Sequence, residues 1–316
     1  MTEADDALLV SLLEERDRAL LREIFGARAS FDAPLAPHTS WRIGGPADAL
    51  LSVETSDELA QVLRLVAKRK LPWYVLGSGS NLLVGDGGIR GVVVRLGSEF
   101  ARIDFDDETG AAVVVRAGAS ASLALLAGQA AGRGALGIDG LVGIPGSVGG
   151  ALRMNAGTDR EIGEFVREVW VQTPAKPAPH AVSPQYFYRH TTLARDAVVA
   201  SVTLAFERGD ATIVRERLQQ RLVRRKESQP LQFPNAGSCF RNPPGDKAGR
   251  LIEAAGAKGW RQGAAEVSEL HANFILNRGG ARAADVAALL ARVRRAVAEQ
   301  FGVDLELEVH FVGVFV

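Results

Sequence analysis

The sequence predicts an α+β protein of two or three domains, and three observations support this. The chain has 316 residues, which is too long for a single ordinary hydrophobic core. Apolar residues follow helical spacing in some segments and form short β-branched runs in others. Hydrophobic residues make up 47% of the chain and charged residues 23%, which is the composition of a folded globular protein.

The charge balance and the cysteine content exclude several classes of protein. The chain has 37 basic and 37 acidic residues, so no overall field favours nucleic acid, and an anionic ligand needs a local cluster of cations. A single cysteine, Cys239, excludes a disulfide framework. Residues 1–6 are acidic, and no apolar run approaches the ~20 residues that span a bilayer. We therefore expect a cytoplasmic enzyme without nucleic-acid or membrane partners, whose oligomeric state the sequence leaves open.

The first part of the chain predicts a helix followed by a small α/β unit. Residues 4–25 carry leucines at helical spacing and mixed charges on the other face, which favours a helix packed on the protein over a membrane-surface or partner helix. Thr55 and Glu58 form a capping-box pattern for a helix that runs to about Lys70. Three strands are expected around this helix, at residues 49–53, 73–76 and 92–96.

The middle of the chain predicts a second unit that is rich in strands. Strands are expected at residues 101–105, 112–115, 166–172 and 197–206, and a helix of small residues at 122–131. The proline-rich segment 174–184 predicts an exposed loop.

A domain boundary is expected between Phe206 and Thr212, where a helix with a basic face begins. Helices are expected at residues 212–227, 248–255 and 283–301, and a non-helical segment with two prolines at 229–234. Residues 305–316 predict a final strand, and its alternation places Glu308 on the polar face. Alternation alone leaves open whether this face meets water or lines a cleft.

A glycine-serine loop follows the strand at 73–76. Its residues are Gly77, Ser78, Gly79, Ser80 and Asn81. Small residues let backbone N–H groups approach a pyrophosphate, and the serine hydroxyls add donors. The loop lacks the third glycine of the Rossmann motif, and by itself it is also compatible with a tight surface turn.

A second glycine-rich segment, residues 137–151, predicts a slot lined by backbone for a flat or phosphorylated cofactor. Its central residues are Gly143, Ile144, Pro145, Gly146, Ser147, Gly149 and Gly150. The alternative is a series of tight turns in a compact β-domain, but so many flexible positions cost conformational entropy and favour a function. Upstream, residues 39–47 form a third element, in which Arg42 pairs either with a phosphate or with a surface carboxylate.

The sequence indicates neither a catalytic cysteine nor a metal site built from histidines. No Cys-His motif surrounds Cys239, which we interpret as a packing residue. The five histidines show no metal-binding spacing, so no metal site is predicted.

With these loops, the sequence resembles the UDP-N-acetylenolpyruvoylglucosamine reductase (MurB) family. The matching segments, in the family's order, are residues 39–47, 76–83, 143–151, 154–157, 188–189, 235–238, Phe240, 242–243 and 308–309. Each segment is a weak signal alone, but the ordered set is specific and covers the chain from about residue 37 to its end. The stretch after Arg189 is short, which resembles the branch of the family without a tyrosine-bearing loop.

The resemblance implies a fold, a set of ligands and domain bounds. The fold is a two-subdomain FAD-binding fold of the vanillyl-alcohol-oxidase (PCMH) type, followed by a C-terminal α+β substrate domain. The implied bounds are a helical extension at residues 1–36, FAD-binding subdomains at 37–105 and 106–208, and a substrate-binding domain at 209–316. FAD is the implied cofactor, NADPH the electron donor and a UDP-sugar the substrate.

The resemblance also implies roles for single residues. FAD N5 gives hydride to an enolpyruvyl group, Arg189 holds the carboxylate of that group, Ser238 protonates the carbon and Glu308 orients its neighbours. Without the family, each has a structural explanation: an exposed arginine, a capping serine and a glutamate facing solvent. The implied cofactor contacts are Arg42, Gly77, Ser78, Gly79, Ser80, Asn81, Gly143, Ile144, Pro145, Gly146, Ser147, Gly149, Gly150 and Arg225. The implied substrate contacts are Tyr188, Arg241 and Asn242.

Several positions depart from the family pattern. Asp139 stands where glutamate is frequent, residues 158–160 replace a small-aromatic-glycine sequence, and Ser228 occupies a site where lysine often lies. His310 replaces a frequent arginine, which puts the substrate contact expected there in doubt. The basic residue that binds the diphosphate of the substrate therefore stays open among Arg224, Arg225, Lys226 and Arg241.

Two other functions are compatible with these loops. The first is an oxidase of the same flavin fold, although residues 76–83 lack a histidine or cysteine to tether FAD. The second is a nucleotide-binding module without catalysis, which has no need for Arg189, Ser238 and Glu308 together.

Overall fold

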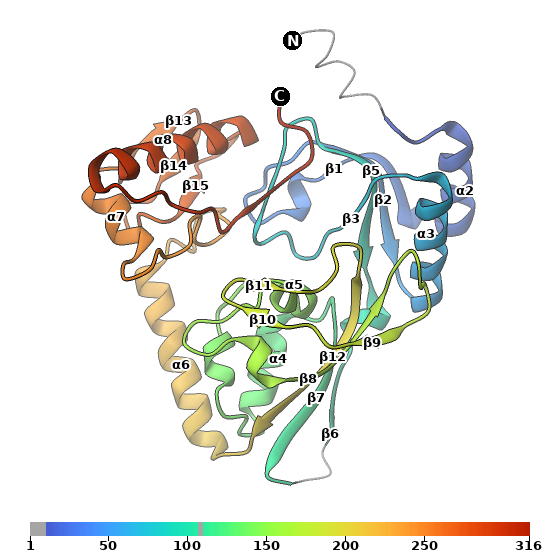
Figure 1. Ribbon diagram of the computed structural model, residues 1–316, viewed down its shortest axis with the longest axis horizontal. Coiled ribbons are helices and arrows are strands. Elements are labelled where there is room, and N and C mark those ends of the chain that lie inside the picture. The colour runs from blue at the N-terminus through green and yellow to red at the C-terminus, as the bar shows by residue number, and fades with distance from the viewer. Residues whose placement is uncertain (1–10, 107–109) are drawn as a thin grey trace.

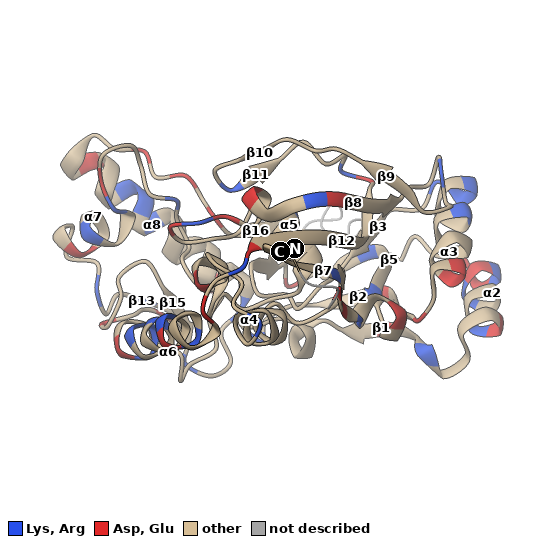
Figure 2. Cartoon of the chain, turned by 90° about the horizontal axis from the view of Figure 1, so that it is seen from below, with Lys and Arg blue, Asp and Glu red and all other residues tan. Residues whose placement is uncertain are grey.

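A computed structural model describes residues 11–106 and 110–316 of the chain. Three parts follow one another in sequence, and Figure 1 shows the long helix α6 (Ala211–Ser228) leading from the second part to the third. Short 3-10 turns lie at Gly26–Arg28, Ala36–His38, Ser98–Ala101, Ile138–Leu141 and Ile162–Phe165. No helix in the described part of the chain is long and apolar enough to cross a membrane. Basic and acidic residues are interspersed on helices such as α2 (Glu15–Phe25), in keeping with the neutral net charge (Figure 2).

The first part is a four-stranded sheet covered by two helices. Its strand order is β1 (Ala29–Pro34), β2 (Pro46–Val53), β5 (Ile89–Leu96) and β3 (Trp73–Val75). The helices α2 (Glu15–Phe25) and α3 (Ser56–Arg69) bury Leu21 and Leu63 against Val92 of the sheet. The predicted strands and the helix after Thr55 are confirmed, whereas β1 was not predicted.

The predicted helix at residues 4–25 is only partly correct. Residues 4–10 lie outside the described residues, and the described helix begins at Glu15. Leu12 and Leu20, expected on the apolar face, are exposed. The core of this part takes Leu13, Leu21 and Phe25 instead, so the buried stripe is narrower than the leucine pattern predicts.

The predicted capping box of α3 is half formed. The Thr55 side chain accepts a hydrogen bond from the Glu58 N–H at 3.2 Å, as predicted. The Glu58 carboxylate, however, accepts from the Glu54 N–H at 2.8 Å and pairs with Arg28. The ion pair with Arg28 therefore replaces the bond that a capping box would form between the Glu58 carboxylate and the Thr55 N–H.

The second part is an antiparallel five-stranded sheet. Its order is β6 (Ile103–Asp106), β7 (Ala112–Gly118), β12 (Val198–Glu207), β8 (Val166–Gln172) and β9 (His180–Val182). Two helices, α4 (Leu123–Ala131) and α5 (Val148–Arg153), pack into the same core as the sheet. The predicted strands β6, β7, β8 and β12 and the helix α4 are confirmed. The predicted loop at 174–184 is wrong in part, because β9 pairs there with β8.

The third part consists of α6, α7 (Ala248–Ala254) and α8 (Ala283–Phe301) with a small antiparallel sheet. All three helices were predicted. The sheet of β13 (Arg261–Gln262), β14 (Ala265–Val267) and β15 (Ile275–Asn277) was not, because strands of two or three residues have no periodicity to detect. The predicted strand at 305–316 is wrong in length, since only β16 (His310–Val312) is a strand.

The end of the chain returns to the first part. Strand β16 pairs in parallel with β4 (Leu82–Val84), directly after the glycine-serine loop. Trp41, fully buried, donates from its indole nitrogen to the Ile275 carbonyl at 2.7 Å. The Asp86 carboxylate accepts from the N–H groups of Ala283 and Ala284 at 2.9 and 3.0 Å, so it caps α8. Polar and apolar contacts together therefore fix the third part against the glycine-serine loop.

We predict that replacing Asp86 by alanine destabilises this junction. The change removes both acceptors at the start of α8 and lowers the free energy of unfolding by about 1 kcal/mol. Urea denaturation followed by tryptophan fluorescence measures it. Asp104→Ala, on the exposed face of edge strand β6, is the control and stays within about 0.5 kcal/mol of the unchanged protein. Equal effects of the two changes would contradict the assignment of Asp86 as a cap.

Candidate active site

The two glycine-rich loops lie against each other. Ser80 donates from its hydroxyl to the Pro145 carbonyl at 2.9 Å. A side-chain carbon placed on Gly146 would lie 3.1 Å from the Ser80 hydroxyl oxygen, and one on Gly77 would lie 3.0 Å from that of Ser147. Ser147 itself caps α5 by accepting from Gly150 N–H at 3.3 Å. A side chain at either glycine would crowd the opposite loop, and the φ of +142° at Gly146 also favours glycine there.

The first loop presents backbone donors that the protein does not use. Among the described residues, none accepts a hydrogen bond from the N–H groups of Gly77, Ser78, Gly79 or Ser80. Gly79 has φ +63°, and a side-chain carbon there would lie 2.3 Å from the His38 carbonyl oxygen. Successive free N–H groups in a glycine turn form a concave site for an anion. The residues present therefore fit the pyrophosphate of FAD.

Two arginines of the basic helix α6 lie near these loops: Arg221 forms ion pairs within the protein, and Arg225 packs against the second loop. Arg221 pairs with Asp139 at 2.8 Å and with Asp159 at 2.6 Å, and the guanidinium lowers the pKa of Asp159 to about 2. Arg225 has no carboxylate partner in the described part of the chain. It packs over Gly143, where a side-chain carbon would lie 2.6 Å from its Cδ, and burial lowers its pKa. Arg225 is thus the half-buried cation that an anion would neutralise.

A hairpin of the second part carries Arg189. Strands β10 (Tyr186–Phe187) and β11 (His190–Thr191) pair in antiparallel fashion, with Tyr188 and Arg189 as the turn. Arg189 has φ +56°, a conformation that costs a residue with a side chain of order 1 kcal/mol and that needs support from its surroundings. Its guanidinium lies 4.7 Å from the ring centroid of the exposed Tyr188.

Two carboxylates provide that support. Arg189 Nε donates to Glu308 Oε1 at 2.7 Å, and Arg189 Nη1 lies 3.5 Å from Glu161 Oε1. Nη1 is buried and has no hydrogen-bond acceptor in the described structure. A buried N–H without an acceptor costs free energy, and an added carboxylate would relieve that cost.

The position of Glu308 is fixed by backbone contacts to two other segments. Its carbonyl accepts from the Asn81 side chain at 3.0 Å, and its N–H donates to the Cys239 carbonyl at 2.8 Å. The glycine-serine loop, Ser238-Cys239 and Arg189 therefore meet at Glu308. Burial raises the pKa of Glu308, and the nearby Arg189 opposes that rise.

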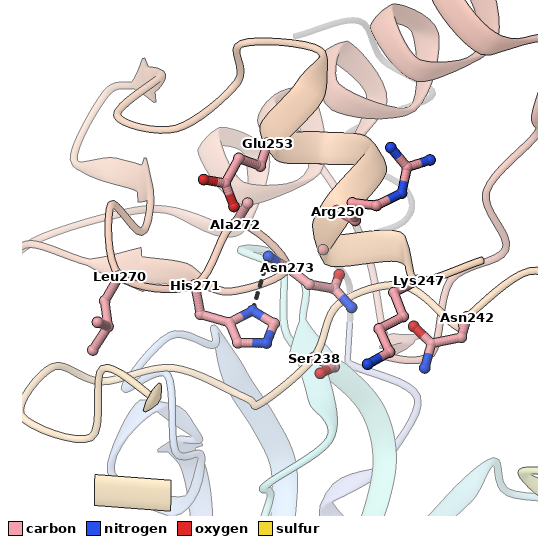
Figure 3. Close-up of a pocket in the computed structure, with 10 residues that line it drawn as sticks. Ser238, Asn242, Lys247, Arg250, Glu253, Leu270, His271, Ala272 and Asn273 are labelled. Carbon is pink, nitrogen blue, oxygen red and sulfur yellow. Dashed lines mark hydrogen bonds between the residues drawn. The ribbon is translucent and has the colours of Figure 1, made fainter. Parts of the chain in front are cut away.

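Ser238 lines a cavity of about 340 Å³ in the third part. Figure 3 shows its hydroxyl in the same hollow as the side chains of Asn242, Lys247 and His271. His271 accepts from the Asn273 N–H on Nδ1 at 3.2 Å, which leaves Nε2 as the protonated nitrogen of the neutral ring, and burial lowers its pKa. The turn before Ser238 requires Gly237, whose φ is +77°.

Other predicted site residues lie at the edges of this region. Asn242 accepts from the Ala248 N–H at 3.0 Å and so supports the start of α7. Arg241 lies 3.3 Å from the exposed Glu306. His310, where an arginine was expected, has Nε2 3.1 Å from Met154 Sδ. Arg42 is exposed with φ +55° and has no side-chain partner in the described part of the chain.

Sequence reasoning missed Glu161 and Asn155 as site residues. Asn155 is 2% exposed and donates to Glu161 Oε2 at 2.5 Å and to the Phe187 carbonyl at 3.0 Å. A signal was present, because Glu161 and Glu164 have capping-box spacing, and both capping bonds form at that turn. That pattern predicts a turn, but it cannot show that Glu161 faces an arginine distant in sequence. No metal-binding cluster of histidine, cysteine or carboxylate side chains occurs among the described residues.

The glycine loops and the fold define an FAD-binding oxidoreductase. Residues 47–174 match the FAD binding domain family, and residues 229–312 match the C-terminal domain of UDP-N-acetylenolpyruvoylglucosamine reductase. The chain is 47% identical to UDP-N-acetylenolpyruvoylglucosamine reductase 2 of Symbiobacterium thermophilum over 96% of its own length and 98% of that protein. It is 46% identical to the reductase of Moorella thermoacetica over 89% and 92% of the two chains.

A solved structure supports the same assignment. The crystal structure of the reductase (MurB) from Thermus caldophilus covers 90% of this chain with 98% of its own, at 38% identity and a TM-score of 0.75. The chain belongs to the UDP-N-acetylenolpyruvoylglucosamine reductase family, which acts in peptidoglycan precursor synthesis. The predicted fold class is confirmed. Membership of a reductase family speaks against the two alternatives, an oxidase and a module without catalysis.

We predict that the thiol of Cys239 is unreactive in the folded protein. Cys239 is 1% exposed, and burial raises its pKa to about 12, so the reactive thiolate is scarce at neutral pH. A disulfide reagent such as DTNB leaves the native protein unlabelled at about pH 8 and labels the thiol after unfolding. Rapid labelling of the native protein would refute the assignment of Cys239 to packing.

Proposed function

We propose that this chain is the NADPH-dependent reductase that converts UDP-N-acetylglucosamine enolpyruvate to UDP-N-acetylmuramate. The observation that carries the proposal is Arg189, held by Glu308 beside the glycine-serine loop, with a buried N–H that lacks an acceptor. Such a cation fits the carboxylate of an enolpyruvyl group. The name of the relatives supports the substrate, and membership of the family supports NADPH as the donor.

Arg189 would bind the substrate carboxylate and stabilise the charge that develops there. FAD, once reduced, supplies hydride to the outer vinyl carbon. The negative charge then accumulates on the carboxylate side as an enolate, which a guanidinium stabilises without losing its proton. Because Arg189 is mostly shielded from water, its attraction for that charge is stronger than at an exposed site.

Ser238 would give the proton that completes the reaction. An alcohol is a weak acid in water, but an enolate is basic enough to take its proton. Support for this role comes from the chain path: Ser238 directly precedes Cys239, whose carbonyl accepts from the N–H of Glu308, the residue that pairs with Arg189. Glu308 would hold Arg189 in place through its bond to Nε and orient the groups around it.

The proposal also covers the remaining contacts and the domain bounds. We propose that Gly77 to Asn81, Gly143 to Ser147, Gly149, Gly150, Arg42 and Arg225 contact FAD, and that Tyr188, Arg241 and Asn242 contact the UDP-sugar. The first set is supported by the N–H groups of the glycine-serine loop and by Arg225, which have no acceptor and no carboxylate partner, respectively, among the described residues. We also propose the domain bounds 1–36, 37–105, 106–208 and 209–316, the branch without the tyrosine-bearing loop, and a cytoplasmic location.

We predict that Ser238→Ala separates the two halves of the reaction. The purified protein is yellow, NADPH bleaches it, and UDP-N-acetylglucosamine enolpyruvate restores the colour. In Ser238→Ala, bleaching by NADPH keeps its rate, but formation of UDP-N-acetylmuramate falls about 10²- to 10⁴-fold because the proton donor is missing. Stopped-flow absorbance at the flavin band, with product analysis, measures both steps.

Ser183→Ala is the matched control, since Ser183 lies on the exposed surface. It keeps both rates. A colourless protein that refuses added FAD would overturn the proposed function altogether. Full product formation by Ser238→Ala would overturn only the role of that serine.

A further inference from the structure

Arg189 is held by a second carboxylate as well as by Glu308. Glu161 Oε1 lies 3.5 Å from Arg189 Nη1, while Glu161 Oε2 accepts from the buried Asn155 at 2.5 Å. Asn155 has φ +44° and also bonds to the Phe187 carbonyl, in the hairpin that carries Arg189. The same amide therefore fixes both Glu161 and the hairpin, which keeps the carboxylate facing the guanidinium.

Arg189 itself has no surplus of positive charge for a further anion. Glu161 and Glu308 both face Arg189, which is one guanidinium between two carboxylates. Of the other charged groups near them, Glu164 pairs with Arg160 on the side of Glu161, and Arg241 pairs with Glu306 on the side of Glu308. A substrate carboxylate would be the third at Arg189, and carboxylates that share a site do not all stay ionised.

We propose that Glu161 is a positioning residue for Arg189 and that it takes up a proton from solvent when the carboxylate of the substrate binds. The inference rests on the proposed function, because it concerns the same anion. Once neutral, Glu161 no longer competes for Nη1, whose buried N–H can then donate to the new carboxylate. Glu308 keeps its bond to Nε, so the guanidinium stays in place while one of its two carboxylates loses charge.

Two features select Glu161 rather than Glu308 as the group that takes the proton. Its contact with Arg189 is the longer of the two, at 3.5 Å against 2.7 Å, so Glu161 loses less attraction on protonation. Burial raises the pKa of both carboxylates, and the charge of Arg189 opposes the rise at each. The charge of Glu164 raises the pKa of Glu161 further, whereas the hydrogen bond from Arg189 and the charge of Arg241 lower that of Glu308. Substrate binding pushes the pKa of Glu161 upwards as well, towards the neutral form at neutral pH.

Calorimetric titration of the FAD-loaded protein tests the proposal. UDP-N-acetylmuramate, which has a carboxylate, is compared with UDP-N-acetylglucosamine, which lacks it, in buffers of different ionisation enthalpy. The dependence of the heat on the buffer gives the number of protons taken up. We predict that binding of the ligand with a carboxylate takes up about one proton more than binding of the ligand without one near pH 7. Equal uptake for the two ligands would overturn the proposal.

Glu161→Gln and Glu164→Gln form a matched pair on the same turn. The first keeps the shape of Glu161 but cannot titrate, so it binds UDP-N-acetylmuramate without the extra proton. The second keeps a capping acceptor and leaves Glu161 able to titrate. Because it removes a charge that raises the pKa of Glu161, the extra uptake remains but shifts to lower pH. Persistence of the extra uptake in Glu161→Gln would show that another group takes the proton and would contradict the assignment. The comparison of ligands on the unchanged protein stays decisive even where Glu161→Gln fails to fold.

Failure of this inference differs from failure of the proposed function. A protein that loads FAD and binds both ligands with equal proton uptake retains the function and refutes the role of Glu161. A protein that binds neither ligand refutes the function itself.

Discussion

The ion pair between Arg189 and Glu308 is the contact on which the rest of the site depends. It joins a hairpin of the second part to the chain end that pairs with β4 of the first. Glu308 is in turn bonded to Asn81 and to Cys239, so the glycine-serine loop, the segment Ser238-Cys239 and the guanidinium share one support. Loss of that support would misplace all three groups at once, which explains why the third part is anchored so firmly on the first.

Backbone conformation is the second constraint, because the two glycine loops must approach without side chains. Gly79 needs its positive φ and its contact with the His38 carbonyl, and Gly146 faces the Ser80 hydroxyl. Such loops cost conformational entropy on folding, and an anion bound to their backbone donors would offset that cost. The positive φ of Arg189 also costs free energy, and its contacts with two carboxylates hold the residue in that conformation.

Most elements of the fold could be predicted from local pattern, and the site could be predicted only in part. The strands and helices around the glycine loops have clear periodicity, whereas β13 to β15 are too short to show one. Arg189, Ser238 and Glu308 were predicted because ordered motifs resemble a family. Glu161 and Asn155 were missed because their roles depend on contacts between distant segments. The capping box at Thr55 was predicted only half correctly for the same reason, because Glu58 pairs with the distant Arg28 instead of completing the box.

The central claim is that Arg189 receives the substrate carboxylate and has no part in the reaction with NADPH. The most direct measurement is stopped-flow kinetics of both half-reactions in Arg189→Lys, which keeps the charge but loses the planar pair of donors. The account predicts an unchanged rate of flavin reduction by NADPH and a slowed reoxidation by UDP-N-acetylglucosamine enolpyruvate. An unchanged rate of reoxidation in this variant would contradict it.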